Sequence, residues 1–260
     1  MSWQPCGHGA DPASDPVGCR GIHVHGHTAC LAHLTDTERT AYLTGLTPGA
    51  DIDHRGTPFT QELLEALLNA LKNPSTGKPQ LGRAMFYGAQ FFGNAPFLDV
   101  QFSNDAWFQG VQFFGDARFS RAQFFGNAEF VDVQFSRRAM FVGAQFSGDA
   151  RFTRAQFSAN AIFIEAQFSR DAWFVAAQIF GDVKFDRAKF EGVSVLGPMV
   201  CAGQVALSGT VFVLPVTLEI AAREVVCERT RWESTATVRL RHAAVNLSHA
   251  VLTAPLSDVP

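Results

Sequence analysis

The segment from Ala84 to Phe190 repeats one three-residue phrase: a small residue, any residue and a large apolar residue. The phrase opens at residues 84–86 and 89–91 and continues at spacings that alternate between five and six residues, with Ile179 in place of one phenylalanine. Glutamine is the middle residue of every second copy, from Gln90 to Gln178. A unit this short cannot bury its apolar face alone and must stack on its neighbours. The sequence therefore predicts an elongated all-β or all-α solenoid without a single globular core.

Local chemistry separates these two solenoids. Two units span eleven residues. In an α-helix, eleven residues end about 20° past three full turns, so phenylalanines eleven residues apart would lie on one stripe of the helix. However, nearly every unit contains a Gly-Asn, Gly-Asp or Asn-Asp pair, as at residues 93–94, 104–105 and 115–116. These residues disfavour helix interiors and suit tight corners. Between corners the chain alternates as a short strand does, so Ala or Val and Phe point inward and the middle residue points outward.

This pattern resembles the pentapeptide-repeat family, which includes bacterial proteins whose units place a small residue two positions before a central Leu or Phe. The resemblance covers residues 84–195, with about twenty consecutive units. It implies the family fold, a right-handed, four-sided parallel β-helix. The sixth residue in alternate units departs from the family's usual form, so that four faces would take 22 residues per coil and not 20.

A longer period of 33 residues is superimposed on the short one, and we interpret it as a record of segmental duplication. If 33 residues formed one coil, like charges would lie in columns about 4.8 Å apart, which is destabilising. A coil of 22 residues leaves one such conflict, between Asp149 and Asp171. Elsewhere it places opposite charges side by side: Asp99 and Arg121, Asp132 and Arg154, Glu165 and Arg187, and Asp116 and Arg138. The charge pattern therefore favours 22 residues per coil, although each surface pair is weak.

The first 83 residues form a predicted leader of different composition, with three of the five cysteines and six of the eight histidines. Zinc binds four sulfur or imidazole ligands in a tetrahedron, and Cys30-x-x-His33 has a usual spacing for one ligand pair. We predict a structural zinc site with His27 as the first substitute ligand and with this preferred set: Cys6, Cys19, Cys30 and His33. The alternative is a loop of reduced cysteines and solvated histidines, but so short a glycine-rich segment has little else to hold it together.

Two short helices are predicted in the second half of the leader. Asp36 is expected to cap a helix over residues 37–43, and Thr57 to precede one that starts at Pro58 and ends at Leu71. We expect the leucine-rich face of the second helix to cover the first coil, whose strand edges would otherwise invite aggregation. The alternative is a helix for dimerisation or for a partner. Residues 73–79 are interpreted as a linker.

Beyond Phe190 the phrase weakens, but apolar and polar residues still alternate. We predict that residues 84–195 form the regular β-helix and that residues 196–260 continue it irregularly to about Leu252. Cys201 and Cys227 are expected to be core thiols and not a disulfide. Residues 254–260 offer no helix to cover the last coil, so we expect a short member or a fragment of a longer chain.

Composition limits location and function. The sequence has neither a signal-peptide pattern nor an apolar run of membrane-spanning length, and its five cysteines suit a reducing cytoplasm. The best-known activity of the resembled family is binding DNA gyrase as a mimic of duplex DNA, which needs a dense negative surface. Residues 84–195 carry ten basic and eleven acidic residues, so neither such a surface nor a basic stripe for direct DNA binding is expected.

The sequence thus predicts a non-catalytic protein-interaction scaffold, with a DNA-mimicking modulator of DNA gyrase or topoisomerase as the alternative. A phosphate loop and a nucleophile elbow are both missing from it, and a zinc site with four protein ligands is closed to substrate. Trp107 and Trp173 are predicted to point outward on one face and to contact the partner, while Met140 falls on the opposite face. We interpret His54, with its charged neighbours, as part of a loop before the second helix.

Overall fold

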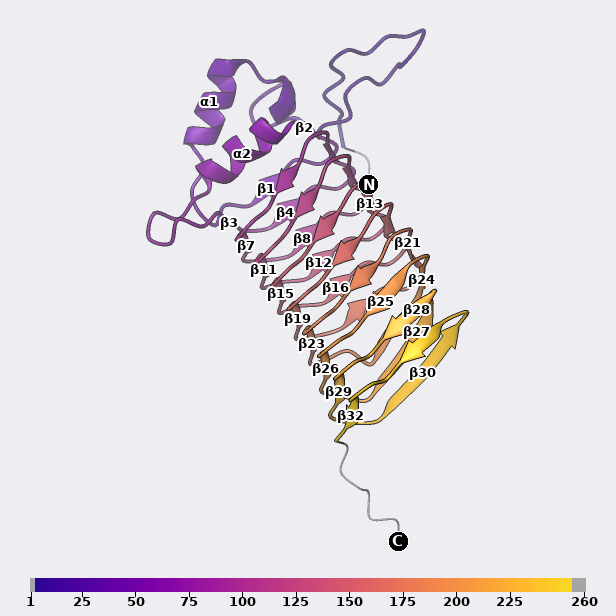
Figure 1. The fold of residues 1–260 in the computed structure, drawn as a ribbon. Helices are drawn as coiled ribbons and strands as arrows, with labels where there is room; N and C mark the ends of the chain where they lie inside the picture. Colours follow the sequence, from indigo (N-terminus) through magenta and orange to yellow (C-terminus); the bar gives the residue numbers. More distant parts are fainter. Residues whose placement is uncertain (1–2, 254–260) are drawn as a thin grey trace.

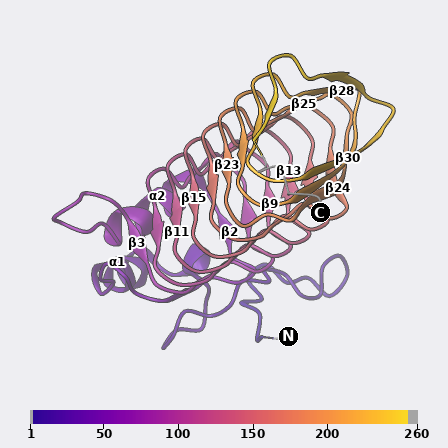
Figure 2. The ribbon, with the colours of Figure 1, turned by 90° about the horizontal axis from the view of Figure 1, so that it is seen from below.

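The computed structural model describes residues 3–253, which form a solenoid of stacked coils with a helical cap at its N-terminal end (Figure 1). Each coil has four sides, and within these residues the strands form four parallel sheets of six, eight, nine and nine strands. The view from below shows the coils as a row of stacked rings (Figure 2). The predicted four-sided parallel β-helix is confirmed. We number its faces 1 to 4 in the order in which the chain visits them.

Most strands contain two residues, of which one points inward and one points outward. Face 1 contains β1 (Ile52–Asp53), β4 (Ala84–Met85), β8 (Ala106–Trp107), β12 (Ala128–Glu129), β16 (Ala150–Arg151) and β20 (Ala172–Trp173). Face 2 contains β2 (Pro58–Phe59), β5 (Gln90–Phe91), β9 (Gln112–Phe113), β13 (Gln134–Phe135), β17 (Gln156–Phe157), β21 (Ala177–Ile179), β24 (Val195–Cys201), β27 (Val216–Ala221) and β30 (Ala236–Arg241).

The other two faces complete each coil. Face 3 contains β6 (Ala95–Pro96), β10 (Ala117–Arg118), β14 (Ala139–Met140), β18 (Ala161–Ile162), β22 (Val183–Lys184), β25 (Gln204–Ala206), β28 (Glu224–Val226) and β31 (Ala244–Asn246). Face 4 contains β3 (Gln80–Leu81), β7 (Gln101–Phe102), β11 (Gln123–Phe124), β15 (Gln145–Phe146), β19 (Gln167–Phe168), β23 (Lys189–Phe190), β26 (Val211–Phe212), β29 (Arg231–Trp232) and β32 (Val251–Leu252).

The register confirms a coil of 22 residues through the regular repeat. Ala84 pairs with Ala106, and side-chain hydrogen bonds join glutamines 22 residues apart, as where the Gln101 amide donates to the Gln123 carbonyl oxygen. In the C-terminal part the coil shortens, and side-chain bonds there join residues 20 apart, as from Gln204 to Glu224. The irregular continuation predicted from the sequence is therefore a change of coil length within one solenoid.

Phenylalanine columns fill the interior. Phe124 stacks on Phe146 with ring centroids 4.9 Å apart and planes inclined by 2°. Adjacent columns meet edge to face, as between Phe119 and Phe130 at 5.4 Å and 85°. Such offset and perpendicular contacts are the favourable geometries for aromatic pairs. The predicted inward positions are confirmed, since these rings are buried.

The first coil lies within the segment predicted as leader. Ile52 pairs with Ala84, Phe59 pairs with Phe91, and Leu81 pairs with Phe102, so residues 52–81 already supply three faces. This coil is longer than the others because helix α2 (Gln61–Ala70) and a turn are inserted between β2 and β3. On face 1, Asp51 and Arg83 are bonded 32 residues apart in the sequence.

Both predicted helices exist, but their starts were wrong. Helix α1 (Asp36–Thr44) is capped by Thr35, whose side chain forms a reciprocal capping box with Glu38. Helix α2 is capped by Thr60 and not preceded by Thr57, because Pro58 and Phe59 form β2 and Phe59 is buried against Phe91. Burial of the Phe59 ring in the core stabilises β2 more than the Thr57-Pro58 signal favours a helix start at this position.

The leucine face of α2 is buried against the solenoid, where the helix contacts β6 at the first edge of face 3. The predicted cover for the first coil is confirmed, and this face is not free for a partner. Cys201 and Cys227 are buried free thiols, also as predicted. The expectation about residues 254–260 lies outside the described residues. Neither helix within residues 3–253 has the length and hydrophobicity to cross a membrane.

Candidate metal centre and contact face

The four predicted zinc ligands come together in the leader. The ligand atoms of Cys6, Cys19, Cys30 and His33 all lie within 4.8 Å of one another. His33 Nδ1 is 3.3 Å from Cys30 Sγ and 3.6 Å from Cys6 Sγ, and the sulfur atoms of Cys19 and Cys30 are 3.7 Å apart. Three sulfur atoms and one imidazole nitrogen facing one point are a usual donor set for structural zinc.

Backbone pairing positions the first two ligands. The Cys6 N–H donates to the Gly21 carbonyl, and the Gly7 N–H donates to the Cys19 carbonyl, so the two arms of a ribbon bring Cys6 beside Cys19. Gly18 adopts φ +62° at the end of this ribbon, where a side chain would clash with Ala10.

A short 3₁₀ helix, η1 (Leu31–His33), positions the other two ligands. Cys30 precedes this helix, and the N–H of His33 donates to the carbonyl of Cys30. The guanidinium of Arg39 on α1 donates to the carbonyls of Leu31, Ala32 and Leu34. Helix α1 therefore holds the turn that carries Cys30 and His33.

Burial and neighbouring groups shift the pKa of three members of the cluster. Burial raises the pKa of Cys30, and the nearby Cys19 and Cys6 raise it further. Burial also raises the pKa of Cys19, whereas burial, His8 and Arg39 lower the pKa of His33. His33 is thus a neutral imidazole that can donate its lone pair, and a bound cation would favour the thiolate forms of Cys19 and Cys30.

The remaining leader histidines do not join this cluster. His27, the predicted substitute, has its Nδ1 3.5 Å from a carboxylate oxygen of Glu38. His8 stacks on the ring of His33, with centroids 4.1 Å apart, and so covers one side of the site. The spacing Cys6-Gly-His8 was the available sequence signal for this stacking.

His54 has a structural position that the sequence analysis missed. It occupies the central inward position of the first coil on face 1, where later coils have phenylalanine, and it is buried between Phe59 and Phe86. Its Nε2 is 3.2 Å from the Tyr42 hydroxyl of α1. The phrase Ile52-Asp53-His54, five residues before Phe59, was the available signal. Asp53 and Arg55 beside it form a two-bond ion pair on the surface.

The predicted contact residues share face 1. Trp107 and Trp173 stand in one outward ladder, with Glu129 and Arg151 between them. Trp173 is 41% exposed, whereas Trp107 is half-buried and stacks on Tyr87 at 6.1 Å. The Glu129 and Arg151 side chains are 2.8 Å apart. Met140 lies on face 3, so it cannot belong to the same patch.

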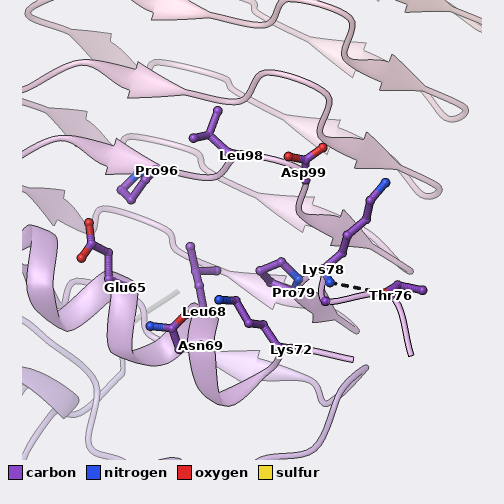
Figure 3. A pocket seen from close by; sticks show the side chains of 11 residues that line it. Glu65, Leu68, Asn69, Lys72, Thr76, Lys78, Pro79, Pro96, Leu98 and Asp99 are labelled. Atoms are coloured by element: carbon purple, nitrogen blue, oxygen red, sulfur yellow. Dashed lines mark hydrogen bonds between the residues drawn. The ribbon is translucent and has the colours of Figure 1, made fainter. Parts of the chain in front are cut away.

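A groove of about 540 Å³ marks the seam between the cap and face 3 (Figure 3). Leu68 of α2 and Leu98 of the solenoid contribute apolar surface to it. Both signs of charge line its rim: Glu65, Lys72, Lys78 and Asp99. Arg121 lowers the pKa of Asp99 through hydrogen bonds, and Lys78 adds to this effect. The groove therefore has no charge preference for one kind of ligand.

The stacked parallel sheets and the repeating sequence phrase place the protein in the class of solenoid proteins built from short structural repeats. A family profile for pentapeptide repeats (9 copies) matches residues 86–134 and, with overlap, residues 108–156. No curated protein and no solved structure matches the chain. The matched segment, residues 86–156, thus consists of pentapeptide repeats, as the sequence resemblance implied.

Proposed function

We propose that this protein is a non-catalytic protein-interaction scaffold, that face 1 is its contact surface, and that its leader holds one structural zinc ion. The proposal places the protein in the reducing cytoplasm, where five free cysteines remain thiols or metal ligands. Its family is one of structural repeats. On the corners of the solenoid, the carboxylates of Asp99, Asp132 and Glu165 are hydrogen-bonded to arginines of the next coil, so these acidic groups hold coils together.

The observation that carries the proposal is the ladder of Trp107, Glu129, Arg151 and Trp173 on one flat parallel sheet. Tryptophan and arginine are enriched among residues that dominate the energy of protein interfaces. On face 1 the strands from β4 to β16 each pair with two neighbours, and β20, which carries Trp173, is an edge strand that pairs with β16. The backbone of this face is thus already ordered before a partner binds, which lowers the cost of binding. The two tryptophans are three coils apart, about 14 Å at the usual strand spacing, which suits a protein surface.

The charge arrangement argues against the DNA-mimicking alternative. Asp99, Asp132 and Glu165 each accept a hydrogen bond from an arginine one coil further on. A column of alternating charges presents little net field to a protein that binds DNA. We therefore expect no inhibition of gyrase supercoiling at about micromolar protein.

A paired set of variants tests the contact surface. The double variant Trp107→Ala/Trp173→Ala removes both anchors from face 1, and Met140→Ala/Ile162→Ala removes comparable apolar surface from face 3. Tagged protein of each kind is used to capture partners from the native cell, and these are identified by mass spectrometry. The proposal predicts that the main partner is lost with the first variant and kept with the second.

Two other outcomes would count against it. Loss of the partner with the face 3 variant alone would move the contact surface to face 3. Recovery of gyrase subunits, together with clear inhibition of supercoiling by the unaltered protein, would establish the alternative. Circular dichroism of both variants shows whether a lost interaction reflects unfolding.

A further inference from the structure

The three cysteines of the leader differ in access to solvent. Cys6 and Cys19 are partly exposed, whereas Cys30 is fully buried. The sulfur atoms of Cys19 and Cys30 are 3.7 Å apart. A disulfide needs about 2.05 Å between sulfur atoms, so a shift of less than 2 Å would join them. Cys19 is thus the more accessible residue of this pair, and the Cys30 sulfur atom lies beside its own.

The same cluster holds the segment that docks on the first coil. The N–H of Ile22, three residues after Cys19, donates to the Arg55 carbonyl at 2.8 Å. A side chain on Gly56 would clash with the carbonyl of Arg20, and a side chain on Gly21 would clash with Cys30. The backbone of residues 20–22 is therefore packed tightly between the metal cluster and the edge of face 1.

The extreme N-terminal arm depends on this segment. The Trp3 indole N–H donates to the Arg20 carbonyl, and its ring lies 5.1 Å from the guanidinium carbon of Arg55. Beyond these contacts and the pairing with residues 19–22, the arm is held by Cys6 in the cluster. Loss of the metal would remove the cross-link that joins the arm, residues 20–22 and the Cys30 turn.

We propose that Cys19 is an oxidation-sensitive ligand, and that hydrogen peroxide converts the site to a Cys19–Cys30 disulfide, expels zinc and loosens residues 3–22 from the first coil. This inference rests on the structural zinc ion proposed above. Zinc keeps the sulfur atoms as thiolates at neutral pH, and the thiolate is the form that attacks peroxide. The metal cluster is then a site of cysteine oxidation as well as a cross-link between parts of the leader.

The reaction balances in two steps. The Cys19 thiolate attacks one peroxide oxygen, the O–O bond breaks, hydroxide leaves, and Cys19 becomes a sulfenic acid. The Cys30 thiolate then attacks the Cys19 sulfur, the S–O bond breaks, a second hydroxide leaves, and the disulfide forms. The two sulfur atoms lose two electrons in total, and one peroxide plus two protons gives two waters. Zinc leaves because only Cys6 and His33 remain as ligands.

The experiment uses the full chain purified without chelator, after its zinc content has been measured. Hydrogen peroxide is added in steps up to a few equivalents, and released zinc is followed with a chromogenic chelator. The intact mass and peptide map are then recorded under non-reducing conditions. We expect about one zinc released per peroxide consumed, a Cys19–Cys30 peptide pair, and faster tryptic cleavage after Arg20. Dithiothreitol with added zinc should reverse all three changes.

The double variant Cys201→Ser/Cys227→Ser is the matched control, because it removes two buried thiols outside the site. It should release zinc as the parent does. Zinc that stays bound in the presence of peroxide, or a disulfide to Cys6 in place of the predicted pair, would overturn this inference and leave the zinc proposal intact. Protein isolated without zinc would overturn both.

Discussion

His54 is the one polar side chain in a column of phenylalanine rings on face 1. Its Nε2 reaches the Tyr42 hydroxyl, but its Nδ1 is buried without a hydrogen-bond partner. Burial lowers the pKa of His54 to about 4, and the nearby Asp53 offsets this only in part. The imidazole is therefore neutral in the folded protein and ties α1 to the first coil.

The buried imidazole predicts a loss of stability in acid. In the unfolded chain His54 takes up a proton near its ordinary pKa of about 6.5, whereas the folded protein resists until about pH 4. Its contribution is thus fully present above pH 6.5 and is lost as the pH falls, by at most about 1.4 kcal/mol per pH unit. The variant His54→Phe should remove this component. Urea unfolding of both proteins at pH 7.5 and pH 5 measures it, and equal pH dependence in the two would refute the assignment.

Phe124 and its neighbour Phe125 give a matched test of the stacked core. Phe124 is 1% exposed and lies between Phe102 and Phe146, whereas Phe125 is 53% exposed. Phe124→Ala should cost about 3 to 5 kcal/mol, because stacked coils cannot collapse around the cavity. Phe125→Ala should stay within about 0.5 kcal/mol of the parent. Chemical denaturation measures both, and equal effects would contradict the inward and outward assignment.

At the corners between strands, backbone strain occurs together with charge pairing. Arg154 has φ +55° and Asp132 has φ +57°, in a region that usually favours glycine, and glycine does stand at the same corner in Gly88 and Gly110. The two side chains form two hydrogen bonds of 2.6 Å across adjacent coils. An exposed pair of this kind is worth about 0 to 1 kcal/mol, which is comparable to the cost of the backbone conformation.

Substitutions at Arg154 should therefore follow backbone preference and not side-chain size. Arg154→Gly loses the ion pair but relieves the strained backbone, so we expect a change of less than about 1 kcal/mol. Arg154→Ala loses the pair and keeps the strain, and Arg154→Val adds β-branching to it. The expected order of stability is Gly, then Ala, then Val, measured by thermal unfolding. A glycine variant less stable than the alanine variant would show that the pair dominates.

The regular elements were predictable because their period is a property of the sequence itself. The four charge pairs that decided the coil size are all present, including Arg138 with Asp116 at 3.0 Å. The first coil was harder, since its phrase contains His54 and Pro58 and is interrupted by α2. The start of α2 was misassigned for the same reason: local signals cannot show that Phe59 is required by a ring, Phe91, that lies 32 residues later in the chain.

The residues of the metal cluster could be predicted from the sequence, but its position in the fold could not. Spacing indicated Cys30 and His33, and composition indicated the two distant cysteines. Their position against the first coil depends on Gly21, Thr57 and the ribbon that pairs Cys6 with Gly21. Such contacts join parts of the chain that carry no common period, so the sequence offered no pattern from which to infer them.

At the scale of the whole molecule, each coil contacts only its neighbours, so a disturbance at one end should stay there. Cys30→Ser should abolish zinc binding and reduce hydrogen-exchange protection in residues 3–34. Protection in the coils from β11 onward should remain within error of the parent. Mass-spectrometric hydrogen exchange and metal analysis test this together. Zinc retained by the variant, or loss of protection throughout the solenoid, would contradict it.

The duplication period and the coil length have a joint consequence for symmetry. A shift of 33 residues is one and a half coils of 22, so each duplicated segment is turned by half a revolution and advanced about 7 Å along the axis. The regular part of the solenoid thus has an approximate twofold screw axis: Met140 on face 3 is the rotated counterpart of Trp107 and Trp173 on face 1. Selection acting on a residue after each duplication would alternately shape two opposite sides, and only every second copy could reinforce the same surface.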